Sequence, residues 1–165
     1  MTHTTELDDG TLARLPIGQW TDAAHTEVIS FIRRWLAARG LTQPQYWIIR
    51  NLHQDDLASA AEAESGLTPA ELTARMSSYL LPQDEPESDA ADLVERGLLT
   101  RDAAGRLRLA EPGRRAHALV KEQLPGVRRE IHAGIDDADY VTTVKVLRRM
   151  ILNVGGEEAL ARYPV

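Results

Sequence analysis

The sequence predicts a mainly α-helical chain that carries one small β-hairpin. Apolar residues recur at helical spacing through most of the chain, beginning with the stripe from Trp20 to Leu36. Two segments, Thr42–Gln45 and Thr68–Glu71, have the sequence of a capping box, in which two side chains satisfy free N–H groups at a helix start. One short segment, 98–109, instead indicates two strands around an Ala-Ala-Gly turn.

The first half of the chain is expected to hold three main helices. The first follows the apolar stripe and ends at Gly40, which suits the left-handed position after a helix. The second begins at Thr42 and runs through Leu52, and the third runs from Thr68 to about Ser78. Between them, the Ala-rich and acidic segment 54–65 is expected to be a short extra helix or a helical linker ending at Gly66.

The second half is expected to hold a short helix from Pro86 to Arg96, the hairpin and two long helices. The first long helix starts near Glu111, and Pro125-Gly126 should kink it or split it in two. The second is capped by Asp136 and stopped by Gly155-Gly156. Two short helices followed by a hairpin, between long amphipathic helices, is the order of a winged helix-turn-helix domain with N- and C-terminal helices that form a dimerisation domain.

Four segments, in this order along the chain, resemble the MarR family of bacterial transcriptional regulators: Leu41–Tyr46, Gly66–Leu72, Leu93–Arg101 and Leu109–Arg114. The resemblance implies a ligand-responsive, DNA-binding homodimer that a small molecule releases from its operator. It also implies a division into a mobile N-terminal tail (1–15), a dimerisation region (16–53 and 111–155), a winged helix-turn-helix (54–110) and a C-terminal tail (156–165).

Two sets of site residues follow from the resemblance. Double-stranded DNA would contact residues of the helix-turn-helix and wing: Arg75, Ser77, Ser88, Arg101, Arg106 and Arg108. A small aromatic or anionic ligand would enter a cleft lined by Trp20, His25, Tyr46, Trp47, Arg50 and Tyr79. In the alternative interpretation the aromatic residues belong to the core, and Arg50 pairs with an acid such as Asp55 or Glu27.

The charge of the chain argues against simple DNA binding. The net charge is −6, and segment 79–95, where the recognition helix is expected, has six acidic residues and no Lys or Arg. Affinity for DNA comes largely from Lys and Arg that displace counterions. The alternative function is therefore a MarR-fold dimer that has lost DNA binding and serves as a small-molecule binding protein or an enzyme of secondary metabolism. In a third interpretation, the acidic face mimics DNA or docks a basic protein partner.

The sequence also excludes several kinds of chemistry. The chain has no cysteine, which excludes disulfides and thiol-based sensing. Its five histidines lack metal-ligand spacing, and no nucleophile elbow or phosphate loop is present. We therefore expect no metal, no cofactor and no catalytic residue. The polar, acidic N-terminal segment and the lack of a long apolar run predict a cytoplasmic protein without membrane contact.

Overall fold

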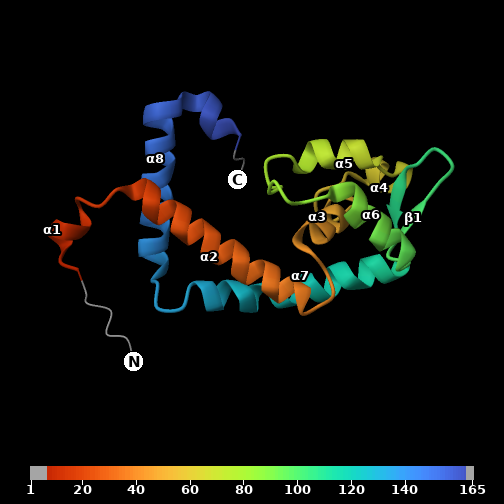
Figure 1. The fold of residues 1–165 in the computed structure, drawn as a ribbon, viewed down its shortest axis with the longest axis horizontal. Helices are drawn as coiled ribbons and strands as arrows, with labels where there is room; N and C mark the ends of the chain where they lie inside the picture. Colours follow the sequence, from red (N-terminus) through yellow and green to blue (C-terminus); the bar gives the residue numbers. More distant parts are fainter. Residues whose placement is uncertain (1–6, 163–165) are drawn as a thin grey trace. The chain divides into compact units, whose positions relative to one another are not determined.

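The computed structural model describes residues 7–162, so residues 1–6 of the predicted N-terminal tail and residues 163–165 lie outside it. The chain divides into two compact units, Met1–Gln123 and Leu124–Val165. Figure 1 shows the elements of both. The described helices and strands are α1 (Asp9–Leu12), α2 (Ile17–Ala37), α3 (Gln43–Asn51), α4 (Ala60–Ser65), α5 (Pro69–Met76), α6 (Pro86–Glu95), β1 (Leu99–Arg101), β2 (Leu107–Leu109), α7 (Glu111–Ile131) and α8 (Asp137–Ala161).

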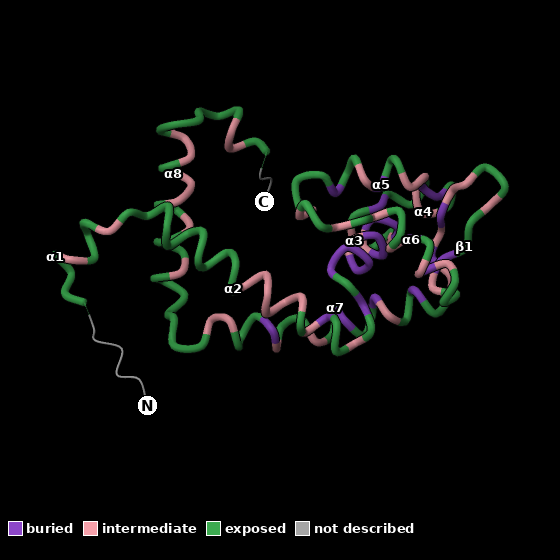
Figure 2. Tube along the Cα trace, in the orientation of Figure 1, coloured by how far each residue is buried: buried purple, intermediate pink, exposed green. Residues whose placement is uncertain are grey.

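The core of the first unit lies among α3, α5 and α6, where Figure 2 shows the largest group of buried residues. Ile48 and Ile49 of α3, Met76 of α5 and Leu93 of α6 are fully buried. Leu36, near the end of α2, joins the same cluster. Burying each such side chain contributes about 2 kcal/mol, so these contacts fix the positions of the three short helices.

The hairpin is antiparallel, with Leu99 opposite Leu109 and Arg101 opposite Leu107. Leu107 also forms a β-bridge with Leu67, so the residue before α5 pairs with the hairpin. Gly66 makes this approach possible. Its φ is +75°, and a Cβ there would lie 2.6 Å from the Leu107 carbonyl oxygen. Only glycine fits this position without moving the backbone.

The predicted capping boxes are confirmed at both positions. The Thr42 hydroxyl oxygen accepts a hydrogen bond from the Gln45 backbone N–H, and the Thr42 backbone N–H donates one to Gln45 Oε1. Thr68 and Glu71 do the same at α5. A third box, between Ser59 and Glu62, starts α4 and shows that the Ala-rich segment forms a true helix from residue 60. Such caps each contribute about 1 kcal/mol.

The second unit holds the end of α7 and α8. The expected split at Pro125 is wrong, because α7 is one helix through this residue. Pro125 is exposed, and a proline ring removes only one backbone hydrogen bond. Asp136 stands at the start of α8, although its side chain makes no capping bond. The predicted stop is only partly correct: Gly156 (φ +67°) interrupts the helix, but helical turns resume as far as Ala161.

Several apolar side chains of the terminal helices remain exposed within this single chain. On α2 they are Ile17 and Trp20, the latter 52% exposed. On α8 they include Val141, Val146 and Val154. None of the described helices combines the length and apolar character that a membrane span requires. Large exposed apolar patches mark surfaces that contact other molecules.

Candidate nucleic-acid interface and ligand pocket

The acidic segment 79–95 contains one carboxylate that is almost completely buried. Asp84, in the loop before α6, accepts hydrogen bonds of 2.9 and 2.7 Å from the two terminal nitrogens of Arg33 on α2. It also accepts one from the Leu81 backbone N–H, and its side chain is only 5% exposed. Burial alone would raise the pKa of Asp84, but these hydrogen bonds outweigh it and lower the pKa. Asp84 is therefore a charged structural residue that joins this loop to α2.

Two further acids, on α6 itself, bind the start of α3. The Thr42 hydroxyl donates to Asp89 Oδ1 at 2.7 Å, and the Gln45 amide donates to Asp92 Oδ2 at 2.8 Å. Burial raises the pKa of Asp89, and the neighbouring acids add to this effect. At the end of α6, Arg96 donates two hydrogen bonds. Its Nη1 donates to Asp92 Oδ2 at 2.9 Å, and its Nη2 donates to the Gly40 carbonyl oxygen at 2.7 Å. Half of the six acids in the segment therefore hold α6 against α2 and α3.

The remaining three acids, Glu85, Glu87 and Glu95, are exposed. Glu87, Ala91 and Glu95 are four residues apart and so share one face of α6, with Ser88 beside them. The solvent-facing side of this helix is thus small and acidic. This face carries two carboxylates in each chain, whereas the six acids of segment 79–95 suggested a more strongly negative surface.

Arg106, just before β2, and Arg108, within it, bind backbone carbonyl groups at the end of α4. Arg106 Nε donates to the carbonyl oxygens of Ser65 and Gly66 at 3.2 and 3.1 Å. Arg108 Nε donates to the Glu64 carbonyl oxygen at 2.7 Å, and Arg108 Nη2 donates to that of Ser65 at 2.9 Å. These carbonyls lack partners within their own helix, so the hairpin caps α4.

The other residues predicted to contact DNA lie at the surface. Arg75 on α5 pairs with Glu62 of α4, and this hydrogen bond is the main reason that the pKa of Glu62 falls to about 2. Arg101 on β1 is exposed and forms no ion pair within residues 7–162. Ser77 and Ser88 are exposed at the end of α5 and on α6. Three of the four arginines therefore already have partners within the described part of the chain.

The residues predicted to bind a ligand separate into two groups. Tyr46 is buried in the core, and the rings of Trp47 and Tyr79 lie 5.4 Å apart. Arg50 donates two hydrogen bonds, of 3.0 and 2.9 Å, to Asp56. Arg50 thus pairs with an acid, as in the alternative interpretation, but with a different one. The second group, Trp20 and His25, lies on the exposed first half of α2, away from the core cluster.

Sequence reasoning missed a buried polar network around His117 of α7. His117 is 2% exposed, and its Nε2 lies 2.9 Å from Asp56 Oδ2. Its ring stacks on His53 with centroids 4.0 Å apart. Burial alone would raise the pKa of Asp56, but bonds from Arg50 and His117 lower it. The signal available in the sequence was the position of His117 between Ala116 and Val120 on the apolar side of α7, where a histidine needs a polar partner.

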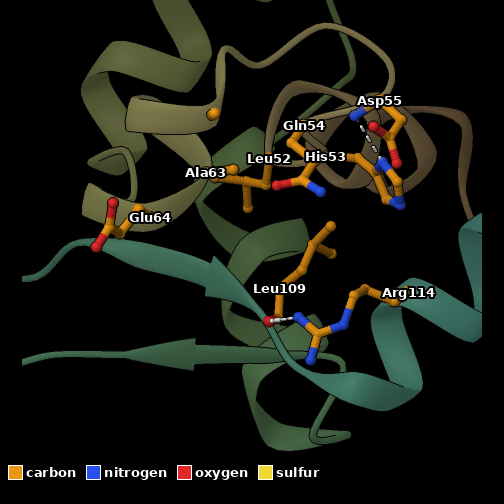
Figure 3. Close-up of a pocket in the computed structure, with 9 residues that line it drawn as sticks. Leu52, His53, Gln54, Asp55, Ala63, Glu64, Leu109 and Arg114 are labelled. Carbon is orange, nitrogen blue, oxygen red and sulfur yellow. Dashed lines mark hydrogen bonds between the residues drawn. The ribbon is translucent and has the colours of Figure 1, made fainter.

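A pocket of about 550 Å³ lies beside this network. Its wall comes from the end of α3 and the following turn, α4, β2 and the first turn of α7 (Figure 3). The lining residues are Leu52, His53, Gln54, Asp55, Ala60, Ala63, Glu64, Leu109 and Arg114. None of the six residues predicted to bind a ligand is among them. Within residues 7–162, no group of three His, Asp or Glu residues is arranged to hold a metal ion.

Comparison with known proteins bears on the fold. No family model matches the sequence, and a search of curated proteins finds no relative. Solved structures do match. The MarR family protein Rv2887 of Mycobacterium tuberculosis is 19% identical, with 82% of this chain and 93% of that one covered at a TM-score of 0.62. Reduced MarR from E. coli is 14% identical, with 83% and 94% covered at a TM-score of 0.61. The chain has the MarR winged-helix fold.

Other solved MarR-fold proteins are described with their ligands. Rv2887 has structures in complex with DNA and with p-aminosalicylic acid. BpsR of Bordetella bronchiseptica, whose DNA binding is regulated by 6-hydroxynicotinic acid, is 18% identical, with 81% of this chain and 97% of that one covered at a TM-score of 0.56.

Proposed function

We propose that this chain is a homodimeric, DNA-binding transcriptional regulator that acts in the cytoplasm and responds to a small molecule. The observation that carries this proposal is the position of α6. The loop before α6 is fastened to α2 through Asp84, and α6 itself is fastened to the start of α3 through Asp89 and Asp92, whereas Glu87 and Glu95 on its other face are exposed. A recognition helix needs this arrangement, because it must be held rigidly while its outer face enters the major groove. The DNA complex of the similarly folded Rv2887 supports the same reading.

In this proposal the wing supplies the phosphate contacts. Arg101 is exposed, and Arg75, Arg106 and Arg108 would join it in contacting phosphates. Ser77 and Ser88 would approach the groove beside them. An arginine that already bonds one carbonyl keeps further N–H groups for a phosphate oxygen. Such contacts fix the position of the protein on DNA without reading its sequence.

The dimer is proposed to form through the terminal helices. The exposed apolar residues of α2 and α8, among them Ile17, Trp20 and Val146, would be covered by a second copy of the chain. Two recognition helices related by two-fold symmetry would then contact successive major grooves. The predicted division into a dimerisation region and a winged helix-turn-helix remains part of this proposal.

The effector is proposed to be a small aromatic or anionic molecule, as with the p-aminosalicylic acid and 6-hydroxynicotinic acid of similarly folded proteins. The ligand residues predicted from the sequence remain candidates in two places. Trp47, Tyr79 and Arg50 lie around α3. Trp20 and His25 lie on α2, where a ligand would need the second copy to complete its site. Binding would shift the population between dimers that fit DNA and dimers that do not.

The experiment that tests DNA binding is selection from a random duplex library at low salt, followed by titration of an enriched duplex at several salt concentrations. Arg101→Gln should weaken binding and reduce the slope of log K against log salt by about 2 per dimer, since each lost phosphate contact removes about 0.9. Arg149→Gln, an exposed change on α8, is the control and should leave the slope unchanged. Failure to enrich any sequence would contradict the proposal.

A second candidate function is favoured by the exposed carboxylates Glu87 and Glu95. They oppose a phosphate backbone, and they support the view that the MarR fold here has lost DNA binding and kept a small-molecule site, as a binding protein or an enzyme of secondary metabolism. The same selection experiment separates the two candidates. If no duplex binds while a small molecule does, the second function replaces the first.

A further inference from the structure

We propose that the pocket bounded by α3, α4, β2 and α7 is a binding site for a small organic carboxylate, and that its occupancy is passed to the wing through α4. The regulatory half of this inference rests on the proposed function, whereas the binding half does not. The pocket differs from the ligand cleft predicted from the sequence. Its walls include α4, the helix formed by the Ala-rich segment between the helices that resemble the MarR family.

Hydrogen-bond donors face the pocket from both sides. His53 Nδ1 accepts a hydrogen bond of 3.2 Å from the Asp55 backbone N–H, which places the proton of a neutral ring on Nε2. This N–H is therefore available as a donor. Figure 3 shows Arg114 below His53, and the side-chain amide of Gln54 beside the His53 ring. Arg114 and His117 are three residues apart on α7, so they share the helix face that His53 stacks against.

Arg114 retains donors for a ligand. Its Nε donates to Glu111 at 3.0 Å and its Nη1 to the Leu109 carbonyl oxygen at 2.8 Å. These two bonds hold the guanidinium in place at the pocket, and Nη2 has no hydrogen bond to any residue between 7 and 162. A fixed guanidinium with free N–H groups pairs with a carboxylate more strongly than with a neutral group.

The rest of the lining is apolar and small. Leu52 and Leu109 close the pocket at the back, and Ala60 and Ala63 leave room on the α4 side. A volume of about 550 Å³ lies within the usual range for small-molecule sites. The two acids, Asp55 and Glu64, lie at the edges of the pocket, and their carboxylates point away from the gap between Gln54 and Arg114 (Figure 3). The occupant that fits is a compact apolar body with one carboxylate.

The pocket is connected to the wing through backbone atoms. Glu64 lines the pocket, and its carbonyl oxygen accepts the 2.7 Å hydrogen bond from Arg108. The next residue, Ser65, accepts bonds from both Arg106 and Arg108. A ligand that displaces α4 therefore changes the positions of Arg106 and Arg108. Leu109, the neighbour of Arg108 on β2, also lines the pocket, so a ligand there would touch both α4 and β2.

The binding half is tested by titrating the full-length protein with benzoate and following backbone amide NMR shifts, with benzamide as the uncharged probe. Benzoate should shift the amides of Gln54, Ala63 and Leu109 at saturation, and benzamide should bind at least tenfold more weakly. Arg114→Gln should abolish the benzoate shifts, whereas Arg115→Gln, its exposed neighbour, should keep them. Ala63→Met should fill the pocket and prevent binding, and Ala61→Met, exposed on α4, should not.

Three outcomes overturn the site: no saturable shifts, shifts confined to other parts of the chain, or equal binding of benzamide and benzoate. The regulatory half is tested separately, with an enriched duplex. Benzoate should change the affinity for DNA of the Arg115→Gln protein but not that of Arg114→Gln. Unchanged DNA affinity at saturating benzoate would overturn the coupling. A protein that binds benzoate in the pocket but binds no DNA would refute the proposed function and leave the site standing.

Discussion

Arg33 on α2 and Asp84 in the loop before α6 form a two-bond ion pair, although 51 residues separate them in the sequence. The carboxylate is nearly enclosed, and the guanidinium is about a quarter exposed. The pair therefore joins the long helix α2 to the segment that precedes α6. Arg33 also donates to Gln43 at the start of α3, so one side chain connects three parts of the first unit.

The first prediction concerns this pair. Arg33→Met should lower the free energy of unfolding by about 2 kcal/mol, because it leaves the buried Asp84 carboxylate without its charged partner. Arg34→Met, at an exposed position on the same helix, is the control and should change stability by less than about 0.5 kcal/mol. Urea denaturation measures both. Equal effects of the two changes would contradict a structural role for the pair.

The second prediction concerns the exposed acids of α6. If this face meets DNA, the double change Glu87→Gln and Glu95→Gln should raise affinity for non-specific DNA roughly tenfold at low salt, because it removes four repelling charges per dimer. The matched control is Glu122→Gln with Glu130→Gln, which removes as many charges from exposed positions on α7. Fluorescence anisotropy with a labelled duplex measures the change, and identical gains in the two proteins would exclude close contact of α6 with DNA.

The third prediction concerns pH. Burial, reinforced by His117, lowers the pKa of His53 below its usual 6.5. The unfolded chain then binds more protons than the folded chain as pH falls below about 6.5, so the folded state loses stability there. His53→Gln should remove this loss, and its stability relative to the wild type should rise between pH 7 and pH 5. His25→Gln, on exposed α2, should not show the same trend. Thermal unfolding at a series of pH values is the measurement.

The fourth prediction concerns the packing of α7 beneath the hairpin. A Cβ added at Gly113 would lie 2.3 Å from the Leu98 carbonyl oxygen, so Gly113→Ala must move the backbone. We expect a loss of about 2 kcal/mol or more. Gly126→Ala in the same helix meets nothing closer than 3.8 Å and should stabilise the protein by up to about 1 kcal/mol. The free energy of unfolding should therefore fall for Gly113→Ala and rise for Gly126→Ala. An unchanged free energy of unfolding in Gly113→Ala would refute the close approach of Gly113 to the Leu98 carbonyl.

The features that could be predicted from the sequence are local ones. A capping box depends on residues three apart, so Thr42 and Thr68 already specified where α3 and α5 begin. Gly97 likewise follows α6 with a φ of +71°, as its place after the predicted helix required. The similarity to MarR-fold structures confirms the order of helices and hairpin that these signals implied.

Tertiary partners could not be predicted in the same way. The count of six acids in segment 79–95 was correct, but their orientation depends on α2 and α3, which are more than 40 residues away. Arg50 pairs with Asp56 and not with the adjacent Asp55, because the turn after α3 directs the Asp56 carboxylate inward and leaves Asp55 exposed. The stacking of His53 on His117 joins residues 64 positions apart, and no periodicity encodes such a pair.

The hydrogen bonds of Arg96 form a second attachment of α6 to the end region of α2, in addition to the Arg33–Asp84 pair. Arg96 bonds the carbonyl of Gly40, three residues after the end of α2, so α6 is attached to the end region of α2 both before its first turn and after its last. Because α6 is attached at two points, it cannot pivot about either of them. In the proposed dimer, α6 would therefore move together with the second half of α2 as one rigid body. The distance between the two copies of α6 would then be determined by the packing of the two chains at the dimer interface.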